Sequence, residues 1–140
     1  MSEIREDKLL TDSVIKLIEK THNLKIEKIK WHERYLGKEC DCYLISKTNK
    51  TVGIELKEID IVKAVKQALE RRDIFNYSYV VMGNGFSLSS YITTLVRKGL
   101  IEKMVNRDIG LIISQENPIL VLRSEFHLLP LQKIFKNFEE

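Results

Sequence analysis

The sequence predicts an α/β fold in which a mixed β-sheet is flanked by helices on both faces. Two patterns support this class: segments with apolar residues at helical spacing, and shorter segments rich in β-branched and aromatic residues. They follow one another in the order α-β-β-β-α-β-α-β-β-α, which a mixed sheet between helices buries well. No repeat or linker divides the 140 residues, of which 44% are hydrophobic, so we expect residues 1–140 to form one domain.

The N-terminal part of the chain is predicted to form one helix and then three strands. Apolar residues at helical spacing, among them Val14 and Ile18, predict a helix over residues 4–21. Strands are predicted over residues 25–31, 41–46 and 51–57. The polar turn between the last two predicts that they pair as a β-hairpin.

The C-terminal part begins with a predicted helix over residues 59–72 and a strand over residues 77–82. Because this helix separates two strands, we expect a right-handed crossover between parallel neighbours. The remaining predicted elements are a turn at 83–85, a helix from 87, strands at 110–114 and 119–123, and a short helix from 131.

Composition limits the classes of protein to which the chain can belong. No run of about eighteen apolar residues is present, so no membrane span is expected. The charged N-terminus lacks the apolar stretch of a secretory signal, which predicts a soluble cytoplasmic protein. The net charge of +3 permits a polyanionic partner without requiring one. Cys40 and Cys42 are too few for a disulfide framework, and we expect buried thiols.

Two acidic residues and a lysine are predicted to meet at one end of the hairpin. Strand alternation places Glu55 and Lys57 on the same face, with Cα atoms about 7 Å apart. Alternation also places Asp41 on the face opposite Cys40 and Cys42. If the two strands pair as a hairpin, Asp41 lies beside Glu55 near the same end of the sheet.

Carboxylate oxygens are hard ligands of the kind that bind Mg²⁺ or Mn²⁺, and the two acidic residues supply them beside a lysine. Such a cation polarises a phosphoryl oxygen and lowers the pKa of bound water. A lysine such as Lys57 orients or deprotonates that water, or offsets charge in the transition state, because its pKa shifts readily. The combination indicates phosphodiester hydrolysis.

The segment CDCYLISKTNKTVGIELK, residues 40–57, resembles the core of the PD-(D/E)xK nuclease superfamily. That superfamily includes archaeal Holliday junction resolvases, many restriction endonucleases and RecB-type exonucleases. Its signature is an aspartate at the start of one strand and Glu-x-Lys at the end of the next. Asp41 fills the first position and Glu55-Leu56-Lys57 the second, while the usual proline before the aspartate is Cys40.

The resemblance implies a fold, a cofactor and a role for each matching residue. It implies a restriction-endonuclease-like αβββαβ core over residues 4–82, with a helix and strand-pair extension over residues 83–140. It implies that Asp41 and Glu55 hold Mg²⁺ or Mn²⁺ with help from the Leu56 carbonyl, and that Lys57 is catalytic.

Two further site residues follow from the resemblance. The family often carries a glutamate on the first helix that reaches back toward the metal, and Glu6, beside the apolar stripe, is preferred for this metal role over Asp7. Its resolvase-like and RecB-like branches also carry a glutamine on the helix after Glu-x-Lys, where this chain has Gln67. Gln67 shares a helical ridge with Asp60, Lys63 and Arg71, and this ridge is expected to line the rim of the site.

Each of these residues also has an ordinary structural interpretation. A lone Glu-x-Lys at a strand end is common, and the helix macrodipole favours acidic residues such as Glu6 in a first turn. Gln67 fits a helix surface equally well, and the run 70–73 is predicted to be a solvated helix end. Tyr77 and Tyr79 are more simply core aromatics than platforms for bases. Lysines at 25, 28 and 30 either form a basic strip or protect an edge strand.

The sequence is therefore expected to encode a metal-dependent nuclease that hydrolyses DNA. Within the family, a structure-selective endonuclease of the Holliday junction type is favoured. Cutting both strands needs two active sites, so a homodimer is expected, and the last two predicted strands are either its surface or plain core. The alternative is an inactive nuclease-fold module that serves as a DNA-binding or protein-interaction scaffold.

Overall fold

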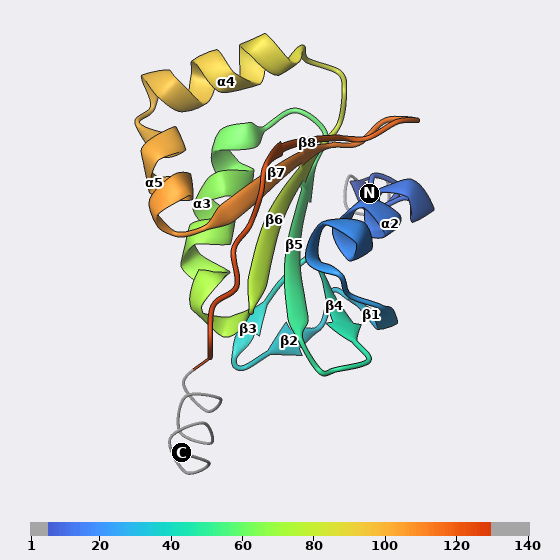
Figure 1. The fold of residues 1–140 in the computed structure, drawn as a ribbon. Helices are drawn as coiled ribbons and strands as arrows, with labels where there is room; N and C mark the ends of the chain where they lie inside the picture. The colour runs from blue at the N-terminus through green and yellow to red at the C-terminus, as the bar shows by residue number, and fades with distance from the viewer. Residues whose placement is uncertain (1–5, 130–140) are drawn as a thin grey trace.

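The computed structural model describes residues 6–129 and places a six-stranded mixed sheet between helices (Figure 1). The helices are α2 (Asp12–His22), α3 (Ile61–Arg71), α4 (Leu88–Arg97) and α5 (Leu100–Asn106), with a 3-10 turn η1 (Arg72–Ile74). The strands of the sheet are β1 (Ile26–Trp31), β4 (Cys42–Ser46), β5 (Thr51–Lys57), β6 (Tyr77–Met82), β7 (Ile109–Ile113) and β8 (Ile119–Leu122). The predicted α/β class with a mixed sheet between helices is confirmed.

The strand order is β1-β4-β5-β6-β7-β8, with parallel strands in the middle and antiparallel strands outside. β4 pairs antiparallel with β5, which confirms the predicted hairpin. β5 and β6 are parallel neighbours joined through α3, as the crossover prediction required. β8 pairs antiparallel with β7 at one edge of the sheet, and β1 pairs antiparallel with β4 at the other.

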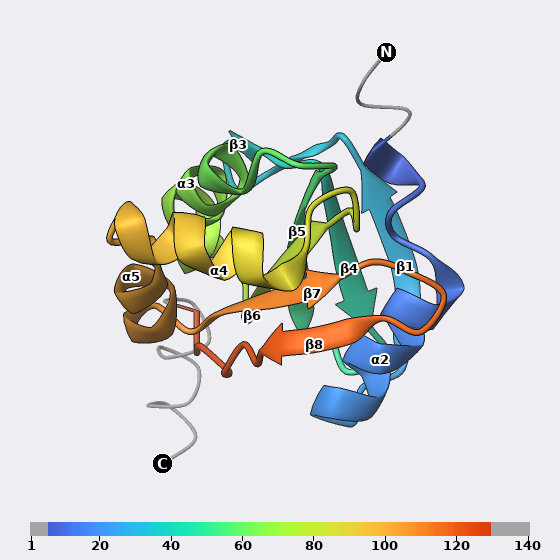
Figure 2. The same ribbon diagram turned by 90° about the horizontal axis from the view of Figure 1, so that it is seen from above.

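Apolar clusters cover both faces of the sheet, and Figure 2 shows α2 separated by the sheet from α3, α4 and α5. On one face, Val14 and Ile18 of α2 pack against the central strands. On the other, α3, α4 and α5 pack against β6 and β7. β7 lies inside the sheet, and its side chains belong to these cores. Tyr77 and Tyr79 are buried in the cluster beneath α2, which confirms their interpretation as core aromatics.

The predicted helix over residues 4–21 is interrupted. Residues 6 and 7 are helical, residues 8–10 form a turn and bend, and α2 begins at Asp12 after the extended N-cap residue Thr11. Thr11 causes the break, because its backbone is extended and its side chain accepts a hydrogen bond from the Val14 N–H, 3.2 Å away. A threonine in this position starts a new helix rather than continuing an old one.

Two further elements differ from the prediction. The single helix expected from residue 87 is two helices, because Gly99 adopts a left-handed conformation, with φ of 68°, between α4 and α5. A short antiparallel ribbon, β2 (Arg34–Tyr35) with β3 (Lys38–Glu39), was not predicted. Leu36 and Gly37 at its turn both have positive φ, as tight hairpin turns require.

The two cysteines are buried, as predicted, but on opposite faces. Cys42 packs beneath α2, whereas Cys40 packs with Tyr43 and Phe75 on the other side. The predicted shared face was wrong because Cys40 precedes β4, so the alternation of the strand does not extend to it. Burial raises the pKa of the Cys40 thiol to about 12, so both residues act as small core side chains.

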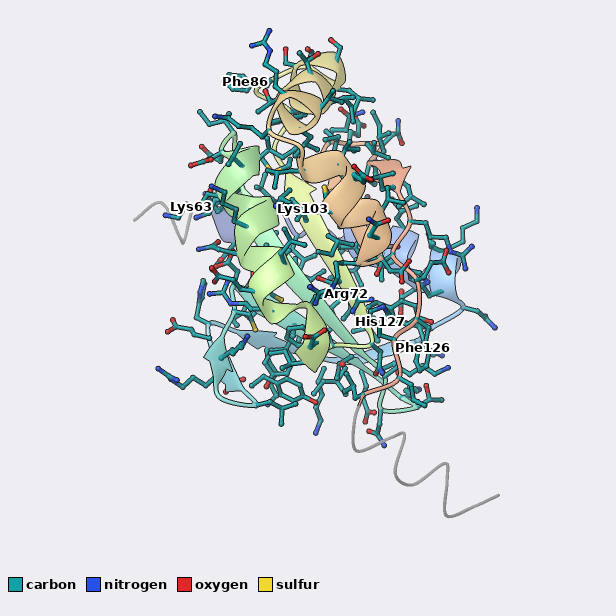
Figure 3. The ribbon with its side chains drawn as sticks, turned by 90° about the vertical axis from the view of Figure 1, so that its left-hand side faces the viewer. Lys63, Arg72, Phe86, Lys103, Phe126 and His127 are labelled. Atoms are coloured by element: carbon teal, nitrogen blue, oxygen red, sulfur yellow. The ribbon has the colours of Figure 1, made fainter. Side chains whose placement is uncertain are left out.

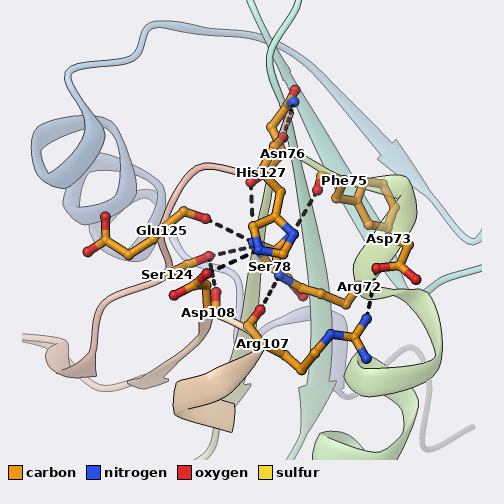
Figure 4. A network of polar contacts seen from close by, with 10 residues as sticks. All are labelled: Arg72, Asp73, Phe75, Asn76, Ser78, Arg107, Asp108, Ser124, Glu125 and His127. Carbon is orange, nitrogen blue, oxygen red and sulfur yellow. Dashed lines mark hydrogen bonds and ion pairs between the residues drawn. The ribbon is translucent and has the colours of Figure 1, made fainter. Parts of the chain in front are cut away.

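Arg72 is fully buried, so the predicted solvated helix end over residues 70–73 was wrong at this position. Its guanidinium donates hydrogen bonds to the carbonyls of Arg107, Phe75 and Glu125 at 2.7–2.8 Å (Figure 4). The segment after β8 is thereby fixed against the start of β6. The helix predicted from residue 131 lies outside the described residues. In residues 6–129, no helix has the length and apolar character that crossing a bilayer requires.

Candidate active site

The hairpin of β4 and β5 brings Asp41 beside the end of β5. Asp41 directly precedes β4, and its Oδ2 accepts a hydrogen bond from the backbone N–H of Leu56, 2.9 Å away. Because β4 and β5 run antiparallel, the residue before β4 lies next to the residues that end β5. Asp41 is therefore fixed beside Glu55 by the backbone of Leu56.

Glu55 is a buried carboxyl group in an environment that opposes its ionisation. Its residue is 3% exposed, and burial is the largest cause that raises its pKa to about 8. The charge of Asp41 raises the pKa further, whereas the Arg71 guanidinium lowers it. The two carboxyl groups are therefore close enough for the charge of Asp41 to oppose the ionisation of Glu55.

Helix α3 places three polar side chains along this site. Lys63, Gln67 and Arg71 recur every four residues, so they share one face of the helix. They line a cavity of about 200 Å³ together with Asp41 and Lys57. The other residues around the cavity are His32, Glu39 and Cys40.

Two buried oxygen atoms at this site lack a hydrogen-bond partner among the described residues: Glu55 Oε2 and Gln67 Oε1. The other oxygen of Glu55, Oε1, accepts a hydrogen bond from Arg71 Nη1 at 2.9 Å. Most buried polar atoms in proteins are satisfied, and leaving one without a partner destabilises the fold. Such atoms are typical of a site that acquires its partners from a ligand.

Glu6 and Asp7 reach the same region but make different contacts. Glu6 Oε1 lies 3.5 Å from Lys57 Nζ, and its Oε2 accepts a hydrogen bond from the Glu58 N–H at 2.9 Å. Asp7 instead pairs with His32 Nε2 at 2.9 Å. The helical-wheel argument for Glu6 does not apply, because the helix breaks before Asp12 and Glu6 lies in a helical segment separate from α2.

All residues of the predicted site lie in one region, and two more join them. Arg71 was expected at the rim of the site, but its ion pair with Glu55 was not predicted. His32 was given no role from the sequence, although it lines the cavity and its backbone N–H donates a hydrogen bond to the Asp41 carbonyl at 2.9 Å. His32 could have been identified from its position, because it directly follows β1, the strand that pairs with β4, and so lies beside Asp41.

The donor set fits a hard divalent cation better than zinc. Within residues 6–129, no cluster of three or more His, Cys, Asp or Glu side chains is suited to hold a metal. Magnesium is commonly held by one or two carboxylates, while water and substrate phosphates complete its coordination. Asp41 and Glu55 match that smaller requirement. Glu55 Oε2, which has no partner among the described residues, lies beside a second carboxyl group whose charge opposes its ionisation, and a bound cation would favour the ionised form of both groups.

Comparisons with known proteins give information on the fold. No family model matches the chain, and no curated protein matches it. Among solved structures, the SPO1766 protein of unknown function from Silicibacter pomeroyi is similar, with a TM-score of 0.53 and 10% sequence identity. The match covers 88% of this chain and 75% of that chain. At this identity, the likeness concerns the α/β fold alone.

Proposed function

We propose that the chain is a metal-dependent nuclease of the PD-(D/E)xK type that hydrolyses phosphodiester bonds in DNA. The observation that carries the proposal is the carboxyl pair of Asp41 and Glu55: Asp41 lines one cavity with Lys57 and Gln67, and Glu55 is buried beside Asp41. These are the residues that the sequence motif singles out, and the order of helices and strands up to β6 is compatible with a restriction-endonuclease-like core.

Asp41 and Glu55, with the Leu56 carbonyl, are the residues that would hold Mg²⁺ or Mn²⁺. When bound, the cation supplies Lewis-acid activation of the phosphodiester and neutralises its charge. Glu6 forms an ion pair with Lys57, because its carboxylate lies 3.5 Å from Lys57 Nζ. Lys57 is thereby oriented toward the cavity that it lines.

The remaining side chains have roles that follow from their chemistry. Lys57 donates hydrogen bonds to a phosphoryl oxygen or to the attacking water and offsets negative charge in the transition state. Gln67 Oε1, which is buried and has no partner within residues 6–129, accepts a hydrogen bond from that water. Arg71 and Lys63, which line the cavity, would offset the negative charge of the scissile phosphate and the additional charge of its phosphorane-like transition state.

Incubation with Mn²⁺ and a panel of linear, flapped and four-way-junction DNAs tests the proposal. We expect cleavage that a chelator abolishes, and a loss of about a hundredfold or more in Lys57→Ala with DNA binding retained. Lys66→Ala is the matched control, because Lys66 is exposed on α3 and does not line the cavity. Failure of the wild type to cut any substrate, or equal rates in both variants, contradicts the proposal.

A structure-selective endonuclease is the activity that we favour within this class. Symmetric cutting of a four-way junction needs two active sites, so we expect the active species to be a homodimer. Preferential cleavage of the junction over linear duplex in the same panel would support this narrower proposal. Equal cleavage of all substrates would contradict it.

A catalytically inactive scaffold is the second candidate. It is favoured by the Arg71–Glu55 ion pair, which already balances the charge of a carboxylate required for metal binding. A scaffold predicts DNA or protein binding that ignores divalent cations and survives Asp41→Asn and Glu55→Gln. The nuclease predicts that both substitutions abolish Mn²⁺ binding measured by calorimetry.

A further inference from the structure

The β2–β3 ribbon extends the candidate site along the end of α3. A hollow of about 380 Å³ lies between the ribbon and α3, lined by Arg34, Gly37, Lys38, Glu39, Glu70 and Arg71. Arg71 and Glu39 also line the cavity that contains Asp41 and Lys57. The hollow and the cavity therefore adjoin one another, with Arg71 between them.

Three cations of this surface, Arg34, Lys38 and Lys63, differ from Arg71 in making no ion pair among residues 6–129. Arg34 Nη1 donates to the Gly37 carbonyl at 3.1 Å, and Lys38 Nζ donates to the Glu70 carbonyl. Within the part of the chain that the structure describes, no carboxylate lies within ion-pair distance of Arg34, Lys38 or Lys63. Their charge is consequently available to an external anion.

The ribbon is held in a fixed position. Tyr35 stacks on Phe75, with ring centroids 5.4 Å apart and planes inclined by 12°, and packs against Tyr43 at 4.9 Å. The hydrogen bond from Lys38 to the Glu70 carbonyl ties the ribbon to α3 as well. A rigid surface binds an anion without the loss of conformational freedom that ordering a mobile loop entails.

We propose that the β2–β3 ribbon and α3 form a track for the sugar–phosphate backbone of the nucleic acid strand that enters the cavity. Arg34 and Lys38 bind phosphates on the ribbon side of Arg71, and Lys63 binds them on the other side. This inference rests on the proposed nuclease function and specifies how its substrate is held. Glu39, on the rim of both hollows, opposes the polyanion and sets a limit on affinity.

Fluorescence anisotropy of a labelled DNA at several salt concentrations, with a chelator present to prevent cleavage, tests the track. Arg34→Gln, Lys38→Gln and Lys63→Gln should each weaken binding about three- to tenfold and lower the salt slope by about one. Lys66→Gln on α3 and Lys103→Gln on α5 are matched controls, since both are exposed and line neither hollow. Figure 3 shows Lys63 and Lys103 on their separate helices.

Two further substitutions separate an effect of charge on DNA binding from an effect on folding. Lys38→Arg keeps the charge and should bind DNA as the wild type does, whereas Glu39→Gln removes a repulsive charge and should tighten binding. Equal weakening by track and control variants would overturn the proposal, as would absence of salt-dependent binding. Binding that follows the track without any metal-dependent cleavage would support the track and refute the nuclease. Metal-dependent cleavage, together with DNA binding that does not change when Arg34 or Lys38 is substituted, would support the nuclease and refute the track.

Discussion

Arg71 Nη1 lies 2.9 Å from Glu55 Oε1, so an arginine in the last turn of α3 supplies the counter-charge for a buried carboxylate of β5. The Arg71 side chain remains partly exposed, whereas that of Glu55 is almost entirely buried. Removing one partner of such a pair leaves the other as an uncompensated charge. The ionisation of Glu55 is therefore coupled to Arg71 on one side and to Asp41 on the other.

The raised pKa of Glu55 predicts that stability falls as pH rises. The folded-state pKa of about 8 exceeds the ordinary value of 4.5, so between these values the folded chain keeps a proton that the unfolded chain has lost. The contribution of protonated Glu55 to the free energy of unfolding is fully present below about pH 4.5 and is lost progressively as the pH rises to about 8. Glu55→Gln, neutral throughout, should gain on the order of 2–4 kcal/mol relative to wild type between pH 5 and pH 8.

Urea unfolding at both pH values measures this difference. Glu27→Gln is the control, because Glu27 is exposed on β1 and its substitution should give the same offset at both pH values. A difference between Glu55→Gln and wild type that does not change with pH would contradict the assigned environment of Glu55.

Gln67 should be more important for activity than for folding. Its Oε1 is buried without a partner among the described residues, so Gln67→Leu removes an unsatisfied polar atom and should change the free energy of unfolding by no more than about 1 kcal/mol, in the stabilising direction. The rate of metal-dependent DNA cleavage should nevertheless fall at least about tenfold. Gln115→Leu, in the surface turn before β8, should leave the rate unchanged. Strong destabilisation by Gln67→Leu would assign Gln67 a structural role instead.

His22 predicts a loss of stability at acidic pH. Burial, and secondarily the charge of Arg123, lowers the pKa of His22 from 6.5 to about 4. Nε2 of the neutral His22 ring lies 2.6 Å from the Tyr79 hydroxyl. Between about pH 6.5 and pH 4, His22 binds a proton in the unfolded chain but stays neutral in the folded chain. Stability should fall by about 1–2 kcal/mol between pH 7 and pH 4.5, a value reduced because His22 is only half-buried. His22→Gln should remove this part of the pH dependence in urea titrations.

Arg72 should be among the residues whose loss destabilises the fold most. Arg72→Met would leave buried carbonyls of Phe75, Arg107 and Glu125 without their donor, at a cost of about 3 kcal/mol or more. Arg97→Met is the matched control, because Arg97 is exposed at the end of α4 and should change stability by less than about 0.5 kcal/mol. Thermal unfolding followed by circular dichroism distinguishes the two, and similar melting temperatures would contradict the role of Arg72.

Elements whose pattern is local were predictable from the sequence. The alternation of β5 placed Glu55 and Lys57 on one face, and the short polar turn after β4 fixed the hairpin that brings Asp41 to them. The apolar spacing of α3 likewise identified its buried side and, by exclusion, the ridge that carries Gln67. These features depend on neighbours within a few residues, which periodicity records.

Features that depend on distant segments were not predictable. The burial of Arg72 requires carbonyl groups from Arg107 and Glu125, which lie far along the chain. The β2–β3 ribbon has strands of two residues each, too short for alternation to be visible. The helix break at Thr11 was hidden because apolar residues continue at helical spacing across it.

The segment after β8 forms hydrogen bonds with the centre of the sheet, whereas β8 itself is an edge strand paired with β7. Ser124 Oγ accepts a hydrogen bond from the Ser78 N–H at 2.9 Å, and the His127 N–H donates to the Asn76 carbonyl at 2.8 Å. Both contacts are to β6 or the residue before it, in the middle of the sheet. Slow hydrogen exchange at Ser78 and His127 would therefore persist while the edge amides of β8 exchange, so that this part of the chain opens with the central strands and not with its sequence neighbours.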